Sequence, residues 1–345
     1  MRRIGRHRQR RENQKKILII GSLSLLLFLC AGYAAFSTNL SITAKGNIKE
    51  KSRVIQSWDD TLQTDFHSDF YKEHVVSATF LDNNNVPDNA TESWNVSEDK
   101  ENGGVMAWVV PSNSDNTKYD LYIGAPAGVI ANEDSGYLFY NFKNVEIINF
   151  NNSYDTGRAT TLEGMFQFCL SLKELDLSTF DTSNVTEMGN LFCMFDNSSG
   201  TVLENNLTKI VFGENFSVEK VRSLSQMFAG CNKLLSIDVS NWDTSNIADM
   251  SSVFAYCSSL IELDLSSWNT ENVILMPWMF IHCDNVTDIN LCNFNTNKVT
   301  TMNSMFSYTQ NLKQVKVGIN WSTNNVDTEF MFEGSAIYSV TTGQC

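Results

Sequence analysis

Apolar and polar positions recur with a fixed period along the second half of the chain. Residues 250–275 have the sequence MSSVFAYCSSLIELDLSSWNTENVIL, and residues 276–301 have MPWMFIHCDNVTDINLCNFNTNKVTT. The apolar positions of the two segments coincide: Met250 with Met276, Phe254 with Phe280, Cys257 with Cys283, Leu265 with Leu291 and Val273 with Val299. A repeat of this length predicts an array of stacked units.

The same period of 26 residues extends in both directions and gives about seven units between residues 137 and 345. Further copies occupy residues 162–187, 188–223, 224–249 and 302–329, with a degenerate opening copy at 137–161 and a truncated closing copy at 330–345. The copy at 188–223 holds about ten extra residues, which we place in a connection because a longer loop costs little free energy.

The hydrophobic period changes within each unit, and this change predicts its shape. Met302, Met305 and Phe306 are spaced as i, i+3 and i+4, which is typical of one face of a short helical turn. Leu263 and Leu265 alternate with polar residues, as a half-buried strand requires. A buried aromatic residue and a bend of the D-T-S-N type follow. The predicted fold is therefore an α/β repeat solenoid in which each unit contributes a short helical turn and a short parallel strand.

The repeat carries a resemblance to a known family. L-x-x-L-x-L at a fixed period is the core of leucine-rich repeats. The longer pattern M-x-x-M-F-x-x-C-x-x-L-x-x-L-D-L-S-x-F-D-T-S-N-V resembles the BspA-type leucine-rich repeat surface proteins of bacteria and some parasitic protists. The resemblance covers residues 137–345. It implies surface display and adhesion to host or matrix molecules, without naming a ligand.

Residues 38–136 contain no repeat. Residues 75–81 have the character of a strand, and residues 105–110 and 119–123 predict a hairpin-like pair with a long connection. A segment of this length can hold a small core. Since a repeat array must protect the apolar end of its first unit, we predict that this segment caps the array. An independent binding domain remains the alternative.

The first 37 residues have the pattern of a targeting segment. Residues 1–16 hold eight Arg or Lys and one Glu, and residues 17–36 carry no charge. A basic stretch before an apolar run predicts a signal peptide, or an N-terminal membrane anchor over residues 17–36, and both remain open. The chain holds 25 basic and 39 acidic residues, so without this segment the net charge is −21. Such a charge repels nucleic acid. From the targeting segment we expect a secreted or cell-surface protein.

The cysteine and histidine residues predict no catalysis. One cysteine occupies the same position in four units, and equivalent positions of a stack point the same way, so buried thiols are favoured over disulfides. No C-x-x-C pair indicates zinc. The four histidines lie in no recognisable nucleophile motif. We therefore predict no enzyme activity, no cofactor and no metal centre. The cysteines of the repeated position are Cys169, Cys231, Cys257 and Cys283.

The exposed strand positions are the default binding site of such an array. Side chains between the buried leucines should stand about 4.8 Å apart in columns on one face. A face of this kind serves either to bind a partner or only to keep the sheet soluble. If the Asp column were a cation site, its oxygen ligands would suit Ca²⁺. The candidate ligand-binding face consists of Glu174, Asp176, Asp238, Glu262, Asp264, Asp288 and Asn290.

Together these patterns predict an exported protein that binds an extracellular protein or glycan through its repeats, as an adhesin does. A structural surface spacer is one alternative. A carbohydrate-binding module is another, although its tryptophans mostly alternate with Phe at a buried position, which favours a role in the core. The tryptophans in question are Trp242, Trp268, Trp278 and Trp321.

Overall fold

The computed structural model describes residues 40–42, 48–58, 63–342 and 345, and it divides the chain into two compact units, residues 1–52 and 53–345. In the first unit, strands β1 (Leu40–Ile42) and β2 (Ile48–Glu50) pair in antiparallel fashion. The predicted membrane anchor stays a prediction. Within the described ranges no helix is long and apolar enough to cross a membrane, and residues 17–36 lie outside those ranges.

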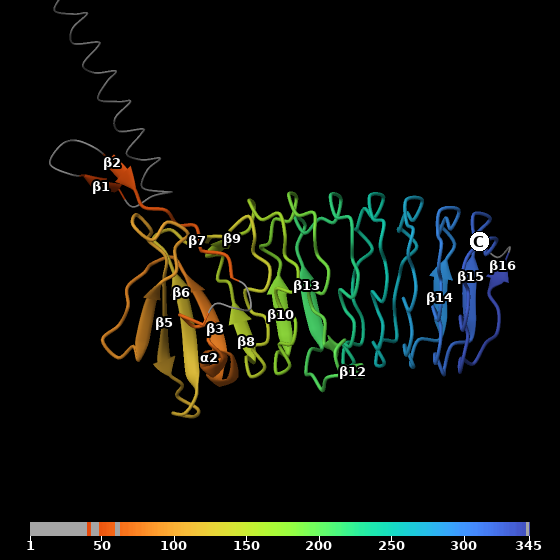
Figure 1. The fold of residues 1–345 in the computed structure, drawn as a ribbon, viewed down its shortest axis with the longest axis horizontal. Coiled ribbons are helices and arrows are strands. Elements are labelled where there is room, and N and C mark those ends of the chain that lie inside the picture. The colour runs from red at the N-terminus through yellow and green to blue at the C-terminus, as the bar shows by residue number, and fades with distance from the viewer. Residues whose placement is uncertain (1–39, 43–47, 59–62, 343–344) are drawn as a thin grey trace, which may run out of the picture. The chain divides into compact units, whose positions relative to one another are not determined.

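The second unit begins with a five-stranded mixed sheet of order β4-β5-β6-β3-β8 (Figure 1). The predicted strand at 75–81 and the predicted antiparallel pairing of the two following β-rich runs are confirmed. Helix α2 (Asp69–His74) precedes β3, and the Ser68 hydroxyl caps it by accepting a hydrogen bond from the Tyr71 amide. The strands are β3 (Val75–Leu81), β4 (Glu92–Asn95), β5 (Met106–Pro111), β6 (Tyr119–Gly124) and β8 (Ile147–Asn149).

This sheet continues into the first repeat. Strand β8 belongs to the opening copy of the repeat and pairs in parallel with β3, so that Ala78 lies opposite Ile148. The buried His67 ring stacks on Trp58 and hydrogen-bonds the Leu138 carbonyl at 2.6 Å. Burial lowers the pKa of His67 to about 3, so the ring is neutral at pH 7. The apolar end of the first repeat is thus covered by the preceding segment, while the domain boundary predicted at residue 136 stays a prediction.

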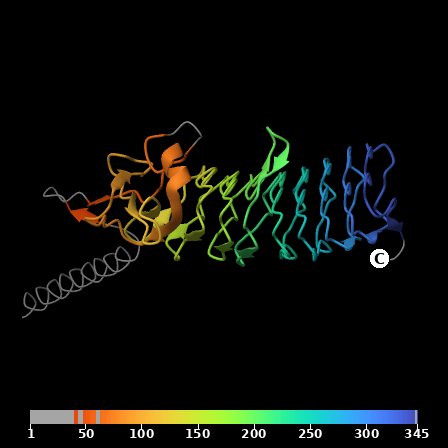
Figure 2. The same cartoon turned by 90° about the horizontal axis from the view of Figure 1, so that it is seen from below.

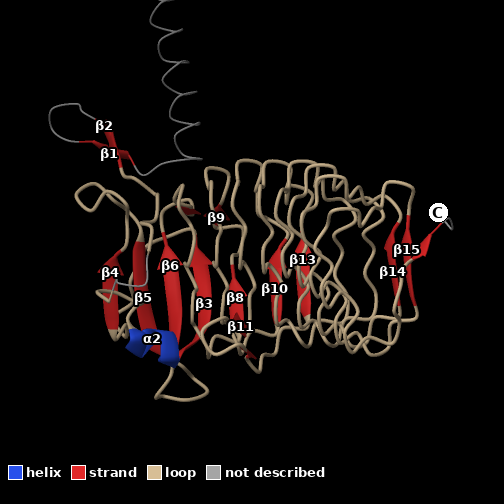
Figure 3. Ribbon diagram, turned by 45° about the vertical axis from the view of Figure 1, so that its right-hand side comes forward, coloured by secondary structure: helices blue, strands red, loops and turns tan. Residues whose placement is uncertain are grey.

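In the repeats, short strands follow one another along one face of the unit (Figures 1 and 3). Strand β10 pairs in parallel with β13, and β14, β15 and β16 form a parallel three-stranded sheet. Between them a parallel bridge joins Ser236 to Glu262. All the remaining strands of the unit, including those outside this face, are β7 (Val129–Ile130), β9 (Tyr154–Asp155), β10 (Glu174–Leu177), β11 (Phe195–Asp196), β12 (Thr201–Val202), β13 (Lys209–Phe212), β14 (Asp288–Leu291), β15 (Gln314–Val317) and β16 (Thr341–Thr342).

The predicted helical turns are wrong, because such segments contain residues with left-handed backbone conformations, two of them in most repeats. Ser252 and Tyr256 have φ of 57° and 60°, and the same two positions recur in the next repeat. A right-handed helix excludes positive φ, whereas the third residue of a type II turn requires it. The Ser252 amide instead donates to the Pro277 carbonyl of the next repeat at 2.9 Å. The Cys257 amide closes a turn onto the Phe254 carbonyl at 3.1 Å, and Tyr256 is the third residue of that turn.

The predicted α/β repeat solenoid is therefore wrong. The described residues form short strands in several mixed and parallel sheets, and α2, with six residues, is the only helix among them. Apolar spacing of i, i+3 and i+4 also occurs in a chain of tight turns, because both arrangements bring such residues to one side. The apolar pattern does not encode the sign of φ, and that sign decides between helix and turn.

A stack of phenylalanine rings fills the centre of the repeats. The Phe254 and Phe280 rings lie 5.9 Å apart at an interplanar angle of 8°, and Phe280 and Phe306 lie 5.6 Å apart at 6°. Such near-parallel spacing is favourable for buried aromatic rings when they are offset. The stack consists of Phe139, Phe166, Phe192, Phe228, Phe254, Phe280, Phe306 and Phe332.

Buried polar side chains satisfy the backbone between neighbouring repeats. The Thr270 hydroxyl donates to the Asn295 carbonyl at 3.1 Å and accepts from the Asn295 amide at 2.8 Å. The Cys257 thiol donates to the Phe228 carbonyl at 3.2 Å, and the other three cysteines of this position make the same bond one repeat away. All four are free and buried, so the predicted column of buried thiols is confirmed.

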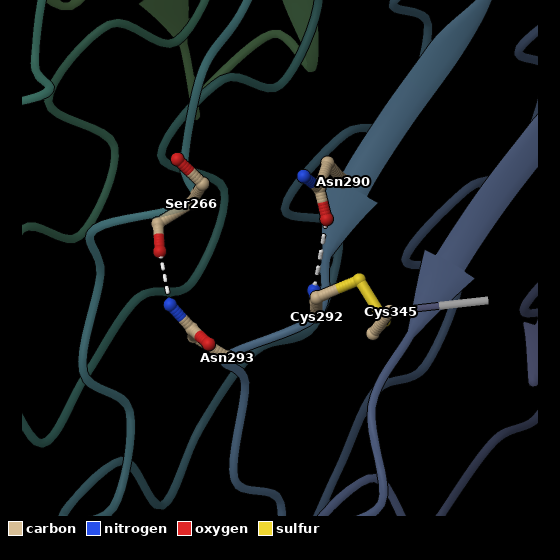
Figure 4. Close-up of a disulfide and its surroundings, with 5 residues drawn as sticks. All are labelled: Ser266, Asn290, Cys292, Asn293 and Cys345. Atoms are coloured by element: carbon tan, nitrogen blue, oxygen red, sulfur yellow. Dashed lines mark hydrogen bonds between the residues drawn. A yellow bond between two sulfur atoms is a disulfide. The ribbon is translucent and has the colours of Figure 1, made fainter. Parts of the chain in front are cut away.

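One disulfide, which the repeat pattern did not predict, closes the C-terminal end. Cys292 follows β14 and bonds to Cys345, with 5.6 Å between their Cα atoms (Figure 4). The Asn290 side chain accepts a hydrogen bond from the Cys292 amide at 3.1 Å in the same turn. Because the two cysteines lie 53 positions apart in the sequence, only the folded chain shows that they meet.

Phe280→Ala should destabilise residues 53–345 by about 3 to 5 kcal/mol, because it opens a cavity in the middle of the ring stack. Ile274→Ala is the control, since Ile274 is 45% exposed in the preceding repeat and should change the stability by less than about 0.5 kcal/mol. Urea unfolding followed by tryptophan fluorescence measures both. Equal losses would contradict the central role of the stack.

Cys345→Ser should lower the free energy of unfolding by about 2 to 4 kcal/mol, because the disulfide restricts the unfolded chain. The measurement is a chemical unfolding curve with and without a thiol reductant. The reductant should destabilise the wild type and leave the variant unchanged. A reductant effect of the same size in both proteins would show that another bond is responsible.

Candidate binding surfaces

The predicted strand face exists, and all seven of its candidate residues are exposed. The strand register sets Asp176 beside Val211 and Asn290 beside Lys316. Asp238 and Asp264 belong to neighbouring repeats, and each lies two residues after its repeat's member of the parallel bridge between Ser236 and Glu262. The other members are flanked by different partners: Glu174 faces Lys209, with 3.9 Å between their charged atoms, and Asp288 faces Gln314. The columns are therefore as expected, but basic residues interrupt them.

The second column has a structural role at the end of each strand. Asp238 accepts hydrogen bonds from the Ser240 amide at 3.1 Å and the Ser240 hydroxyl at 2.6 Å. Asp264 accepts from the Ser266 amide at 2.9 Å, and Asp176 and Asn290 make the same bond two residues ahead. These bonds close the turn after the strand. They also hold the pKa of the Asp176, Asp238 and Asp264 carboxyls below the usual value, because the serine hydroxyls and amides stabilise the carboxylate.

The hypothesis of a calcium site in the Asp column finds no support. Within the part of the chain that the structure describes, no group of three or more His, Cys, Asp or Glu side chains could hold a metal ion. The Asp238 and Asp264 oxygens already accept hydrogen bonds from their own turns. Lys316 stands beside Asn290 and would oppose a cation there.

A cavity of about 560 Å³ hollows the strand face. The rings of Phe212, Phe216 and Trp242 line it, and Trp242 stacks on Phe216 at 5.9 Å. Four carboxylates complete its lining, those of Glu214, Glu219, Asp238 and Asp243. Of these, only Asp238 belongs to the predicted face.

This cavity arises where the bend after the strand is one residue longer than in the neighbouring repeats. Phe212 and Phe216 are separated by three residues, whereas Val239 and Trp242 are separated by two. The extra residue is accommodated by Gly213, where a Cβ atom would run into the backbone of the preceding repeat. The irregular spacing is visible in the sequence, but the hollow beside it depends on how the repeats are arranged.

A second hollow lies beside the extra residues of the copy at 188–223. There β11 and β12 form an antiparallel hairpin, which projects on the side away from the parallel strands (Figure 2, green). A cavity of about 330 Å³ lies next to it, lined by Phe195, Tyr256 and Trp278 among others. The sequence analysis places the extra residues in a connection, and this placement does not predict the site. The signal that could have found it is an insertion next to aromatic residues that fall outside the apolar repeat positions.

The four tryptophans divide between core and surface. Trp268 is fully buried and Trp242 is 4% exposed, as their alternation with Phe predicted. Trp321 packs partly buried against the core. Trp278 is 45% exposed and lines the second cavity. Of the four, Trp278 is therefore the one whose ring faces a cavity beside the hairpin.

Comparison with protein families assigns the repeats. A family profile matches residues 134–237 and 222–342, which together exceed half of the chain. The chain belongs to the family described as Mycoplasma protein of unknown function, DUF285. The predicted membership of the BspA-type leucine-rich repeat family is therefore wrong. No curated protein and no solved structure shows a significant match to this DUF285 chain.

The pattern L-x-x-L-x-L is not specific to leucine-rich repeats. In L-x-x-L-x-L, the last two leucines are buried positions of a short strand and the first is a buried position before it. Any repeat with such a strand shows this pattern. In the DUF285 chain, Leu260 and Leu265 are buried in this way while the adjoining segment is a chain of turns. The adhesin role that the resemblance implied therefore loses that basis.

Asp264→Ala should cost this DUF285 chain about 0.5 to 1.5 kcal/mol of stability, because it removes the acceptor for the Ser266 amide. Asp264→Asn should cost less, because Asn290 makes the same bond in the next repeat. Urea unfolding measures the two variants. The structural role of the column would be contradicted if the Ala and Asn variants lost stability equally.

Proposed function

We propose that this protein is exported and binds a basic segment of another protein on the strand face of its repeats. The observation that carries the proposal is the 560 Å³ cavity, whose lining includes four acidic residues and three aromatic residues. The proposed role is binding rather than catalysis. Export is supported by the basic residues 1–16 and the uncharged run that follows.

The chemistry of the cavity suits lysine and arginine side chains. Their aliphatic stems pack on apolar surface while the charged end remains near solvent, and a cation is attracted to the face of an aromatic ring. Phe212, Phe216 and Trp242 offer the apolar surface. Hydrogen bonds from Ser240 and Ser245 lower the pKa of Asp238 and Asp243, so both are ionised at neutral pH.

The net charge of the whole chain favours such a partner. At −14, the protein attracts basic molecules and repels nucleic acid and anionic surfaces. Exposed ion pairs contribute little individually, so affinity must come from the rings and the charges acting together. A protein that served only as a spacer would have no need of an acidic cavity over aromatic rings.

The double variant Asp238→Asn, Asp243→Asn should bind a fluorescent Lys- and Arg-rich peptide about three- to thirtyfold more weakly, as expected for the loss of two partly screened charges. Both changes keep the turn acceptor, since Asn269 and Asn290 make the same bonds in this chain. Fluorescence anisotropy at low and at physiological salt gives the dissociation constants.

The matched control is Asp264→Asn, which removes a charge from the same column outside the cavity lining. It should change the dissociation constant less than twofold. The proposal is rejected if the peptide does not bind the wild type, if an acidic peptide binds equally well, or if the control weakens binding as much as the double variant does.

A further inference from the structure

The hairpin β11–β12 completes a row of aromatic rings at the second left-handed position of the repeats. Tyr256, His282 and Tyr308 occupy this position in successive repeats and stack with centroids 4.9 and 4.8 Å apart. The preceding repeat has Gly230 there. Phe195 of the hairpin takes the missing place and stacks on Tyr256 at 4.9 Å and 11°.

Gly230 and the hairpin depend on each other. A Cβ atom at Gly230 would lie 2.8 Å from the Met194 carbonyl carbon and 2.9 Å from the Phe195 amide nitrogen. The position is glycine because the hairpin backbone passes directly over it. The φ of Gly230 is also 80°, a conformation that glycine adopts without steric cost. The insertion therefore builds one wall of the cavity.

The rest of the cavity has a small apolar floor and a polar rim. Ala229 and Ala255 form the floor, where the next repeat has the bulkier Ile281. On the rim, Asn197 of the hairpin and Gln226 of the repeat exchange two amide hydrogen bonds of 3.0 and 2.9 Å. This pair holds the hairpin over the repeats.

Trp278 offers a free aromatic face to the same cavity. Among the described residues no other ring stacks on it, and it is 45% exposed. The rings of the Phe195–Tyr256–His282–Tyr308 row, by contrast, cover one another. Trp278 is thus an exposed aromatic surface held next to amide and hydroxyl groups, those of Gln226, Ser251 and Ser252.

The lining of this cavity carries no Asp, Glu, Lys or Arg, in a chain of which 19% is charged. A ligand of about one ring fits its 330 Å³, near the lower end of ligand pockets in general. Such a ligand must be neutral, with an apolar face to lie on Trp278 and a rim of hydrogen-bonding groups for amides and hydroxyls. A pyranose ring has this character, since its C–H groups form one face and its hydroxyls the edge.

We propose that the cavity between the hairpin β11–β12 and Trp278 binds a neutral sugar residue of a glycan. The site is separate from the acidic cavity of the strand face, because the two share no lining residue. The sugar ring lies on Trp278, and Gln226 and the serine hydroxyls bind its edge.

The test uses the full chain with a panel of neutral oligosaccharides built from glucose, galactose, mannose and N-acetylglucosamine. Tryptophan fluorescence and saturation-transfer NMR detect binding. We expect at least one oligosaccharide to bind, Trp278→Ala to weaken it at least tenfold, and Trp278→Phe to retain part of the affinity. Asn197→Ala, which breaks the amide pair, should weaken binding as well.

The double variant Asp238→Asn, Asp243→Asn is the control and should bind the sugar as the wild type does. It distinguishes a failure of the sugar-site proposal from a failure of the proposal for the acidic cavity. Trp278→Ala should unfold at the wild-type urea concentration, because the side chain is exposed. The proposal is overturned if no neutral oligosaccharide binds, if Trp278→Ala binds as well as the wild type, or if an uncharged apolar peptide displaces the sugar.

Discussion

Parallel stacking of one buried phenylalanine per repeat is the interaction on which the rest of the structure depends. The rings lie 5.4 to 6.0 Å apart, and this spacing is compatible with backbones about 4.8 Å apart because stacked rings are offset. With the rings in register, each turn segment can donate alternate amides to the next repeat. Buried Thr hydroxyls such as that of Thr270, and the thiols, then satisfy the remaining carbonyls and amides. The surface residues of successive repeats therefore follow the same spacing.

Both candidate binding cavities occur where the repeat is irregular. A perfectly regular array presents the same shallow surface at every repeat, because each side chain is covered by its equivalent in the next. One extra residue at Gly213 widens a bend and opens the acidic cavity. The hairpin over Gly230, together with the alanine floor, opens the neutral one. The regular repeats provide the rigid support, and the irregular ones provide the shape a ligand needs.

The acidic strand face combines two roles in the same atoms. Asp238 and Asp264 end their strands by accepting hydrogen bonds from the following serine, and Asn290 does this equally well. The turn requires an oxygen acceptor at this position but no charge. A carboxylate therefore adds to the electrostatic character of the face, and its charge can be removed without removing the turn. This separation makes the functional role of the charge accessible to substitution.

The sequence alone determined the period, the buried column and the exposed column, because alternation in a strand and repetition at 26 residues follow from which side chains leave water. The buried Phe254, the exposed Asp264 and the free thiol of Cys257 are all readable in this way. Strand β3 was predicted for the same reason.

Only the tertiary structure decided the conformation of the turns and the location of the cavities. The sign of φ at Ser252 and Tyr256 is set by amide bonds to the neighbouring repeat, which apolar spacing cannot reveal. Cys292 and Cys345 meet because the last strand pairs with β15, and Phe195 meets Tyr256 because the hairpin folds back over Gly230. These contacts join segments far apart in sequence. Their energies depend on how the segments are placed in space, which a local sequence pattern does not reveal.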